Sequence, residues 1–509
     1  MLAVLMFGTS LVQFYSYTMD DSFITFRYAQ NLVTGQGLFF NPDDPTRAEG
    51  LTSPLYALVI APFMLLGDSV LDHSKWLGVV VMIGAAGFAG LTTRRLTSSL
   101  EARDSVAIAV LCAAHILADP FVAANAVSGM ETALSCLAFS VFLLLLMPLE
   151  RTETGRSRAR AVGAGIAAVT VPMLRPEMTL AVGTMLVLVA LFHHESRRET
   201  LLAFAVFVIL GAFYFAARFT YYGLLLPLPF YIKQSGGLNG IFDVLRYIRH
   251  ALPLFVALLL LALSLFRSGF RPSNNSSAFV LALMAAVVVQ VAYYASLTHL
   301  MGFGYRYFQP ISVALTILGF VGVSKVLLVF PSIRSRPWLL RPFVAAFWLG
   351  SVAYLAGTDG HVKRFISDLS APWLEAQVRV ARELRIAANG DPWTIAINDC
   401  GAIPFYTGFE TIDLAGLNNR AIALDRDPKA AMRELERRQP DLIFLQSRRT
   451  EGNVEVLGWE NLTIDEIRRL GYDFLGGMPV AFGYEYQAFA PRERSGLIGT
   501  RMRAAGLIH

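Results

Sequence analysis

The amino-acid sequence predicts a polytopic α-helical membrane protein that ends in a soluble α/β domain. Only 16% of its 509 residues are charged, whereas soluble globular proteins carry about 25%. The apolar residues gather in long runs, for example at 79–91, 137–147, 252–266 and 311–330. Each run approaches the roughly 20 residues that an α-helix needs to cross a bilayer. Because hydrocarbon offers no water to backbone groups, we expect these runs to be helices.

The formal net charge of +5 does not indicate a nucleic-acid partner, because the arginines lie mostly in short loops between apolar runs. Cys112 and Cys136 lie inside apolar runs and Cys400 is far from both, so no disulfide framework is expected. Residues 1–17 lack a basic n-region and a small-residue cleavage site. We interpret them as a first span rather than a removed signal peptide.

The positions of the arginines predict the topology. Five arginine clusters, at 94–103, 151–160, 197–198, 267–271 and 334–341, are separated by two apolar runs each. The positive-inside rule therefore places all five in the cytoplasm. This assignment gives about eleven transmembrane helices in residues 1–357.

The same rule predicts a first outer loop at 19–74. Within it, residues 52–66 are expected to form a juxtamembrane helix along the interface, because counting them as a span would place Arg94 outside. Pro54 and Pro62 suit a short, interrupted helix better than a clean span.

The residues from 358 to 509 have a different character. Short apolar runs at 393–397 and 441–445 predict buried strands, and the more polar stretches 371–388 and 428–439 predict helices. Alternating strands and helices indicate a small α/β domain. Because an odd number of spans precedes it, we expect this domain to be extracytoplasmic, on a multi-pass protein of the inner (plasma) membrane.

Two adjacent aspartates, Asp20 and Asp21, follow the first span. Asp21 alone could be explained as the N-cap of the next helix. Two neighbouring carboxylates beside lipid require more, since acidic residues there are costly and usually functional. A carboxylate can accept the proton of an attacking sugar hydroxyl, stabilise oxocarbenium charge or hold a cation. Two together raise one pKa, so both aspartates are candidate catalytic residues.

Further charged residues are expected on the same outer face, and each alone is more typical of an interfacial anchor. Arg175, Lys233 and Arg306 together place three cations where an anionic lipid headgroup would lie, so we predict that they bind a donor phosphate. Arg175 and Glu177 flank a proline in a tight apolar hairpin, a costly place for charge without a task. The sequence contains no P-loop, HExxH, paired CxxC or Gly-x-Ser-x-Gly motif.

Several short motifs occur one after another along the chain. They are Asp20-Asp21, Tyr28-Ala29, Asn31-Leu32, Gly35-x-Gly37-Leu-x-Phe40-Asn41-Pro42, Glu49-Gly50-x-Thr52-x-Pro54-Leu55, Gly129-x-Glu131-Thr132, Arg175-Pro176-Glu177, Tyr221-Tyr222-Gly223 with Pro227, Tyr231 and Lys233, Arg306 with Pro310, Asp399-x-Gly401-Ala-Ile-Pro404-x-Tyr406, and Ile412-Asp413-Leu414-x-Gly416-Leu417. In these motifs the sequence resembles the GT-C-fold glycosyltransferases, and is most similar to the mycobacterial-type terminal arabinofuranosyltransferases.

The resemblance implies a catalytic acidic pair after the first span and two juxtamembrane helices in the first outer loop. It also implies an inverting transferase that moves a sugar, with arabinofuranose as the leading choice, from a polyprenyl-monophosphate donor. The acceptor would be a cell-envelope glycan, a glycolipid or a protein. A divalent cation stays open as a cofactor, and no metal ligand is assigned. The candidate substrate-binding residues are Arg47, Glu49, Glu131, Glu177, Tyr221 and Tyr305.

Two other functions stay open. A lipid-linked sugar flippase or other transporter often shows inverted repeats and mid-membrane charges, and the sequence shows neither. A non-catalytic outer-face sensor or assembly protein is the second. Replacing Asp20 and Asp21 would leave such a sensor intact and would abolish a transferase.

Overall fold

The computed structural model describes residues 1–67, 69–147, 154–232, 239–267, 275–297, 302–327, 336–425, 427, 429–450, 453–457, 462–481 and 483–508. Internal contacts divide the chain into two compact units. The helical unit consists of Met1–Tyr15, Leu71–Ala216 and Ser235–Ile366. The sheet unit consists of Ser16–Val70, Ala217–Gln234 and Ser367–His509. Part of the predicted first outer loop therefore belongs to the same compact unit as the C-terminal residues.

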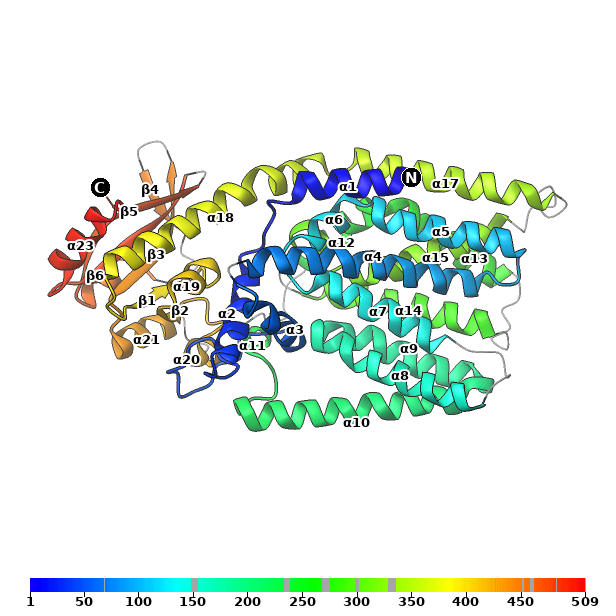
Figure 1. The fold of residues 1–509 in the computed structure, drawn as a ribbon, viewed down its shortest axis with the longest axis horizontal. Coiled ribbons are helices and arrows are strands. Elements are labelled where there is room, and N and C mark those ends of the chain that lie inside the picture. The colour runs from blue at the N-terminus through cyan, green and yellow to red at the C-terminus, as the bar shows by residue number, and fades with distance from the viewer. Residues whose placement is uncertain are drawn as a thin grey trace. The chain divides into compact units, whose positions relative to one another are not determined.

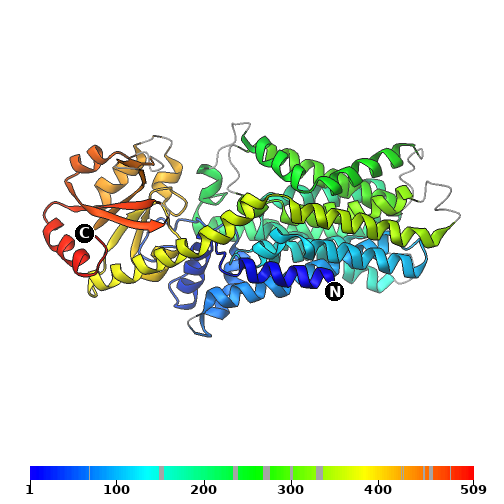
Figure 2. The ribbon, with the colours of Figure 1, turned by 90° about the horizontal axis from the view of Figure 1, so that it is seen from above.

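The helical unit is a bundle of apolar helices that run side by side (Figures 1 and 2). The helices that lie wholly or mostly in this unit are α1 (Leu2–Phe14), α4 (Val70–Leu96), α5 (Ala102–Ala118), α6 (Pro120–Ala126), α7 (Thr132–Leu146), α8 (Thr154–Leu174), η1 (Pro176–Met178), α9 (Thr179–Phe192), η2 (His194–Ser196), α10 (Arg197–Tyr222), α12 (Asn239–His250), α13 (Leu252–Arg267), α14 (Asn275–Ala295), η3 (Phe303–Tyr305), α15 (Gln309–Leu327), η4 (Pro337–Leu339) and α17 (Leu340–Gly357).

The helix α15 lies at the centre of this bundle, because 72% of its apolar window is buried, compared with 11% for the helix that ends at Tyr222. α15 packs against α13, α14 and α7, and α9 packs against α14. The outer helix α10 exposes large apolar side chains such as Ile209 and Phe213. Such side chains on a long apolar helix suit contact with lipid.

Five helices are long and apolar enough to cross a membrane, and seven if two bent pairs each count as one span, in the part of the chain that is described. The bent pairs are α5 with α6, at 66°, and α12 with α13, at 88°. Asp119 separates the first pair and caps α6 by accepting a hydrogen bond from the Phe121 amide at 2.9 Å. Because α1, α7 and α9 are shorter apolar helices, the number of eleven spans stays a prediction.

The sheet unit contains a six-stranded sheet in the order β2-β1-β3-β6-β5, with β4 paired to β3. β1 pairs in parallel with β2 and β3, and the other pairs are antiparallel. The strands are β1 (Thr394–Ile397), β2 (Glu410–Asp413), β3 (Leu442–Thr450), β4 (Asn453–Val456), β5 (Tyr472–Ala481) and β6 (Tyr484–Pro491). The strands predicted at 393–397 and 441–445 are therefore present as β1 and β3.

The helices that lie wholly or mostly in this unit are α2 (Asp21–Val33), α3 (Pro54–Met64), α11 (Leu228–Ile232), α18 (Gly360–Ala388), α19 (Ala402–Thr407), α20 (Arg420–Leu424), α21 (Ala430–Arg438), α22 (Ile464–Arg469) and α23 (Ser495–Ala504). The helix predicted at 52–66 is present as α3, which packs against α2. The helix predicted at 371–388 is longer in the structure. It begins at Gly360 and continues through Pro372 without a break.

Alternate residues of β3 face the two sides of the sheet, as strand geometry requires. Leu442 and Phe444 share a core cluster with residues of α18 and α23. Ile443 and Leu445 share another with residues of α21 and α22. The sheet is thus covered by α18 and α23 on one face and by α21 and α22 on the other, with α18 drawn in yellow in Figure 1.

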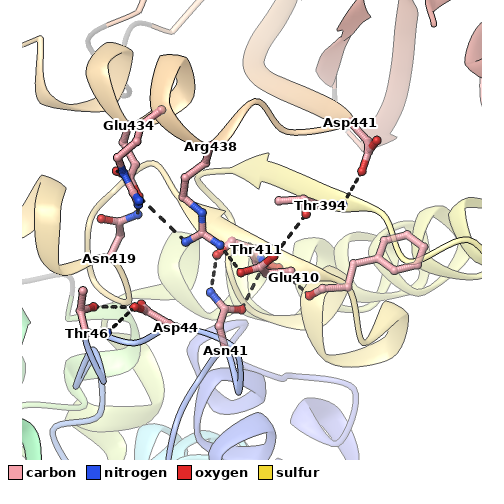
Figure 3. A network of polar contacts seen from close by, with 12 residues as sticks. Asn41, Asp44, Thr46, Thr394, Glu410, Thr411, Asn419, Glu434, Arg438 and Asp441 are labelled. Carbon is pink, nitrogen blue, oxygen red and sulfur yellow. Dashed lines mark hydrogen bonds and ion pairs between the residues drawn. The ribbon is translucent and has the colours of Figure 1, made fainter.

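The first-loop residue Asn41 bonds the edge strand β2 (Figure 3). Its Nδ2 donates to the Thr411 carbonyl at 2.6 Å, and its Oδ1 accepts from the Thr411 amide at 3.1 Å. These two bonds satisfy backbone groups that an edge strand would otherwise leave open. On the same strand, Glu410 forms an ion pair with Arg438 of α21. The loop after α2 is thereby fixed to the sheet that carries the candidate site.

Candidate functional site

Asp20 lies at the start of α2 and its carboxylate binds the N-terminus of α19. Its Oδ2 accepts from the Gly401 amide at 3.1 Å, and its Oδ1 accepts from the Ala402 amide at 2.8 Å. The Gln377 amide, oriented by its partners, donates to the same Oδ1 at 3.0 Å and accepts from Trp373 Nε1 at 3.2 Å. All three donors are neutral, and together they hold the partly exposed carboxylate of Asp20 in one orientation.

The close approach between Asp20 and α19 requires a glycine at position 401. A Cβ atom on this residue would lie 2.2 Å from Cγ of Asp20 and 2.3 Å from its backbone oxygen. No side chain fits at these distances unless α2 and α19 move apart. The glycine therefore allows the carboxylate to reach two consecutive backbone amides.

Arg27 holds α2 in this position, although sequence analysis assigned it no role. Its buried guanidinium donates to the carbonyls of Phe40, Pro404 and Phe409 at 2.7, 2.6 and 2.7 Å. It therefore ties α2 to α19, through the Pro404 carbonyl, and to the segment before β2. An arginine within an apolar helix face was the available signal, since such a residue is rarely buried without partners.

Asp399 is a second carboxylate beside Asp20 that sequence analysis assigned no role. It follows β1, and its Oδ2 accepts from the Tyr486 and Tyr484 hydroxyls at 2.6 and 3.1 Å. The neighbouring Asn398 donates to Gln446 of β3 at 3.0 Å. These side chains lie at the carboxyl end of β1, which has one parallel neighbour on each side, β2 and β3. Ligand sites of open α/β sheets usually form at such a point.

The pair Asp20 and Asp399 binds protons more readily than isolated carboxyl groups do. Burial and the negative charges of Asp399 and Asp21 together raise the pKa of Asp20 to about 7, against the hydrogen bonds from the Ala402 and Gly401 amides, which lower it. Burial also raises the pKa of Asp399, against the hydrogen bonds from Tyr486 and Tyr484. A carboxylate with a pKa near neutrality is a suitable proton acceptor.

Asp21 is the first residue of α2 and not its N-cap, so the capping interpretation of this residue is wrong. Asp20 occupies the N-cap position, yet its side chain makes no capping bond to α2. Its carboxylate instead bonds the first amides of another helix, α19. Asp21 is partly exposed and lies in the first turn, where its charge complements the helix dipole.

In the helical unit, the structure brings together four of the predicted charged residues. Arg175 is buried and pairs with Glu131 at 2.8 Å and with Glu177 at 3.5 Å. It also donates to the Thr132 hydroxyl at 2.8 Å. Its guanidinium lies over the Tyr307 ring at 5.0 Å, and that of Arg306 lies over the same ring at 5.3 Å. Two buried guanidinium groups therefore share one aromatic ring.

The backbone before Arg306 adopts a left-handed conformation at two consecutive residues. Gly304 has φ of 59° and Tyr305 has φ of 55°, and the latter is uncommon for a residue with a side chain. The Tyr305 ring stacks on His250, with centroids 4.8 Å apart, and meets Phe121 edge to face at 5.1 Å. This packing holds a conformation that typically costs about 1–3 kcal/mol and is common at functional sites.

The remaining predicted residues lie in the sheet unit, apart from Lys233, which is outside the described residues. Glu49 is buried and forms an ion pair with Arg218 at 2.6 Å. The Tyr221 ring stacks on Phe39, with centroids 5.2 Å apart, and Arg47 lies over both rings at 5.4 and 5.6 Å. The roles of these residues in substrate binding stay predictions.

A divalent cation has no designated site in the part of the chain that is described. No group of three or more His, Cys, Asp or Glu side chains is placed there to hold a metal ion. The cation therefore stays an open prediction.

Comparisons with known proteins agree with the predicted fold. A family model described as a domain of unknown function (DUF8728) matches residues 368–489, which include five strands and most of β6. Comparison of the sequence with curated proteins found no match.

Solved structures match the chain over most of its length. The crystal structure of ArnT from Cupriavidus metallidurans bound to undecaprenyl phosphate has a TM-score of 0.60 and 14% identity, and 96% of each chain is covered. Its apo state gives 0.57 and 15%, with 97% of this chain and 98% of that chain covered. The apo oligosaccharyltransferase of Archaeoglobus fulgidus gives 0.51 and 12%, with 87% of this chain and 69% of that chain covered.

At these identities the likeness shows a shared fold. ArnT and the oligosaccharyltransferase have the GT-C fold, so the fold predicted from the sequence motifs is confirmed. The resemblance to arabinofuranosyltransferases stays a prediction. With five to seven helices able to span a bilayer among the described residues, the chain is a multi-pass membrane protein of the GT-C fold.

Proposed function

We propose that this protein is an inverting glycosyltransferase that uses a polyprenyl-monophosphate sugar as donor. The observation that carries the proposal is Asp20, a partly exposed carboxylate that is held by the Gly401 and Ala402 amides and has a raised pKa. It occurs in a chain with the fold of ArnT, which was crystallised with undecaprenyl phosphate. A positioned base and a lipid-phosphate donor together define this class of reaction.

In the proposed reaction, the acceptor hydroxyl passes its proton to the Asp20 carboxylate as its oxygen forms a bond to the anomeric carbon. The bond from the anomeric carbon to the phosphate oxygen breaks, and polyprenyl phosphate leaves with the electron pair. A single displacement of this kind inverts the anomeric centre. Asp20 is proposed as the base because the Gly401 and Ala402 amides fix its orientation and its pKa is raised.

Arg175, Arg306 and Lys233 are proposed to bind the donor phosphate as its charge develops. Support comes from the two guanidinium groups on the Tyr307 ring, because guanidinium groups match phosphate oxygens bidentately. Glu131 and Glu177 would then orient Arg175, to which both are paired.

The finer parts of the proposal follow the sequence motifs. Arabinofuranose is the proposed sugar, and a cell-envelope glycan, glycolipid or protein is the proposed acceptor. Residues 1–357 are proposed to span the plasma membrane about eleven times. The first outer loop, with α3 along the interface, and residues 358–509 would face the cell exterior.

The test is sugar transfer by the reconstituted full-length protein from polyprenyl-phosphoryl arabinofuranose to a cell-envelope glycan acceptor. Asp20→Asn should lower kcat by about 10²–10⁴-fold, because it removes a positioned base. Asp21→Asn should lower kcat less. Asp473→Asn is the matched control, since Asp473 is partly exposed and pairs with Arg492. Near-normal turnover in Asp20→Asn and in the Asp20→Asn/Asp21→Asn double variant would contradict a general-base role.

A further inference from the structure

We infer that the sheet unit binds an anionic group of the acceptor in a cavity lined by Arg382, Arg385 and Tyr406. As an assignment of the acceptor class, the inference rests on the proposed transferase function. As a binding site for an anionic sugar, it can be tested without any transfer reaction.

The cavity has a volume of about 400 Å³ and lies between α18 and α19. α18 contributes Val378, Arg382, Arg385 and Ile386, and α19 contributes Tyr406. The four residues of α18 occupy positions i, i+4, i+7 and i+8, which lie on one face of a helix. The volume is within the range of roughly 300–1,000 Å³ that is typical of ligand pockets.

The two arginines have little compensating charge. The Arg382 side chain is 71% exposed and approaches only Glu383, at 4.0 Å, among the acids that the structure describes. Arg385 forms no ion pair with any described residue. By contrast, Arg433 of the same unit pairs with Asp425 and Asp427 at 2.5 and 2.6 Å. Two guanidinium groups with so little nearby negative charge, lining one cavity, can bind a phosphate or a carboxylate bidentately.

The cavity lies close to the proposed base. Tyr406 belongs to α19, the short helix whose first amides bind Asp20. Residues 402 and 406 of this helix are separated by about 6 Å along its axis. The Tyr406 ring also contacts Phe23 of α2, with centroids 5.4 Å apart. An acceptor whose hydroxyl reaches Asp20 can therefore extend a neighbouring substituent to the arginines.

The cavity suits an anionic glycan better than a lipid headgroup. Binding to anionic lipid surfaces usually requires clusters of four to eight basic residues. The exposed charged residues of α18 around the cavity are Glu375, Arg379, Arg382 and Arg385, so three basic side chains stand beside one acid and fall short of such a cluster. The Tyr406 ring and the aliphatic side chains of Val378 and Ile386 provide apolar surface for the C–H face of a sugar ring.

Binding of glucose 6-phosphate and of glucose to the full-length protein, in nanodiscs of phosphatidylcholine, tests the inference. Saturation-transfer NMR titrations give the two dissociation constants without donor or acceptor turnover. The wild type should bind glucose 6-phosphate more tightly than glucose. The Arg382→Ala/Arg385→Ala variant should lose about tenfold or more of the affinity for glucose 6-phosphate and keep that for glucose.

The matched control is Arg468→Ala/Arg469→Ala, which removes the same charge from exposed positions on α22 and should retain the preference. Equal binding of both sugars by the wild type, or an equal loss in the control, would overturn the inference. So would a dependence on the two arginines that occurs only in nanodiscs of phosphatidylglycerol, which would indicate a lipid site. Because Asp20→Asn should keep the binding preference, failure of this site and failure of the proposed function are distinguishable.

Discussion

Charged side chains are stabilised differently in two regions of the molecule. The carboxylate region lies in the sheet unit and consists of Asp20 and Asp399. The arginine region lies in the helical unit and consists of Arg175, Arg306, Glu131 and Glu177. In the carboxylate region, neutral groups hold the acids: backbone amides bind Asp20 and tyrosine hydroxyls bind Asp399. In the arginine region, Arg175 has direct carboxylate partners at 2.8 and 3.5 Å.

The difference decides what each region can do. Neutral donors fix a carboxylate without cancelling its charge, so a proton is the remaining compensation and the pKa of Asp20 is raised. Opposite charges in contact cancel one another and resist titration. The first arrangement suits transfer of a proton, and the second suits a fixed electrostatic field around an anionic ligand.

The largest expected effect follows from removing the central cation of the arginine region. Arg175→Ala would leave the buried Glu131 and the partly buried Glu177 without their cationic partner, and breaking a buried ion pair in this way typically costs about 3–5 kcal/mol of stability. Arg246→Ala is the control, because Arg246 pairs with Asp243 at 3.3 Å but its side chain is 67% exposed, and such pairs contribute about 0–1 kcal/mol. Unfolding in mixed micelles measures both. Equal losses would show that the ion pairs of the arginine region are hydrated.

An intermediate effect is expected where the carboxylate region depends on the glycine. Gly401→Ala places a Cβ 2.2 Å from Cγ of Asp20, so we expect a loss of about 1–3 kcal/mol in stability. The separation of Asp20 from the Gly401 and Ala402 amides should also lower kcat. Gly390→Ala is a comparison without a steric clash, since no atom lies within 4 Å of its Cβ position, although its φ of 89° favours glycine. Turnover unchanged in Gly401→Ala would show that the Asp20 contact is not needed.

The smallest expected effect is a shift in the pH at which activity rises. Since a base must be deprotonated, kcat/KM, which reports the pKa values of the free enzyme, should rise with pH through about 7, where Asp20 titrates. Asp399→Asn removes the neighbouring negative charge, so this rise should move to lower pH. The pH profile of kcat/KM in wild type, Asp399→Asn and the control Asp473→Asn measures it. An unchanged or upward-shifted profile in Asp399→Asn would contradict the coupling of the two carboxylates.

The same titration predicts a pH dependence of stability. The pKa of Asp20 is higher in the folded protein than its ordinary value of 3.8, so the folded state binds more protons than the unfolded state between these limits. Asp20 therefore lowers stability progressively as pH rises from about 4 to about 7. Asp20→Asn should flatten this decline, and a decline of the same slope in the variant would assign it to other groups.

The elements whose signal is local could be predicted from the sequence alone. Long apolar runs predict membrane helices, because a helix must be long enough to cross the hydrocarbon and must satisfy its own backbone. The runs at 393–397 and 441–445 predict β1 and β3, and the arginine clusters with Pro54 and Pro62 predict a separate short helix at α3. The sequence also singled out Asp20 and the Arg175-Pro176-Glu177 turn, because charge beside lipid is costly.

The partners of each charged side chain, by contrast, follow from the tertiary structure. Gly401 lies 381 residues from Asp20 along the chain, and the carboxylate reaches it because Arg27 ties α2 to α19. The partner of Asp20 at Asp399 follows from the position of β1 between two parallel strands. Local periodicity predicts which face of an element is buried, but it contains no information on which distant segment covers that face. The pairing of strands and the packing of helices supply this information. The sequence predicts a site at the adjacent residues Asp20 and Asp21, whereas in the fold Asp399 also lies beside Asp20.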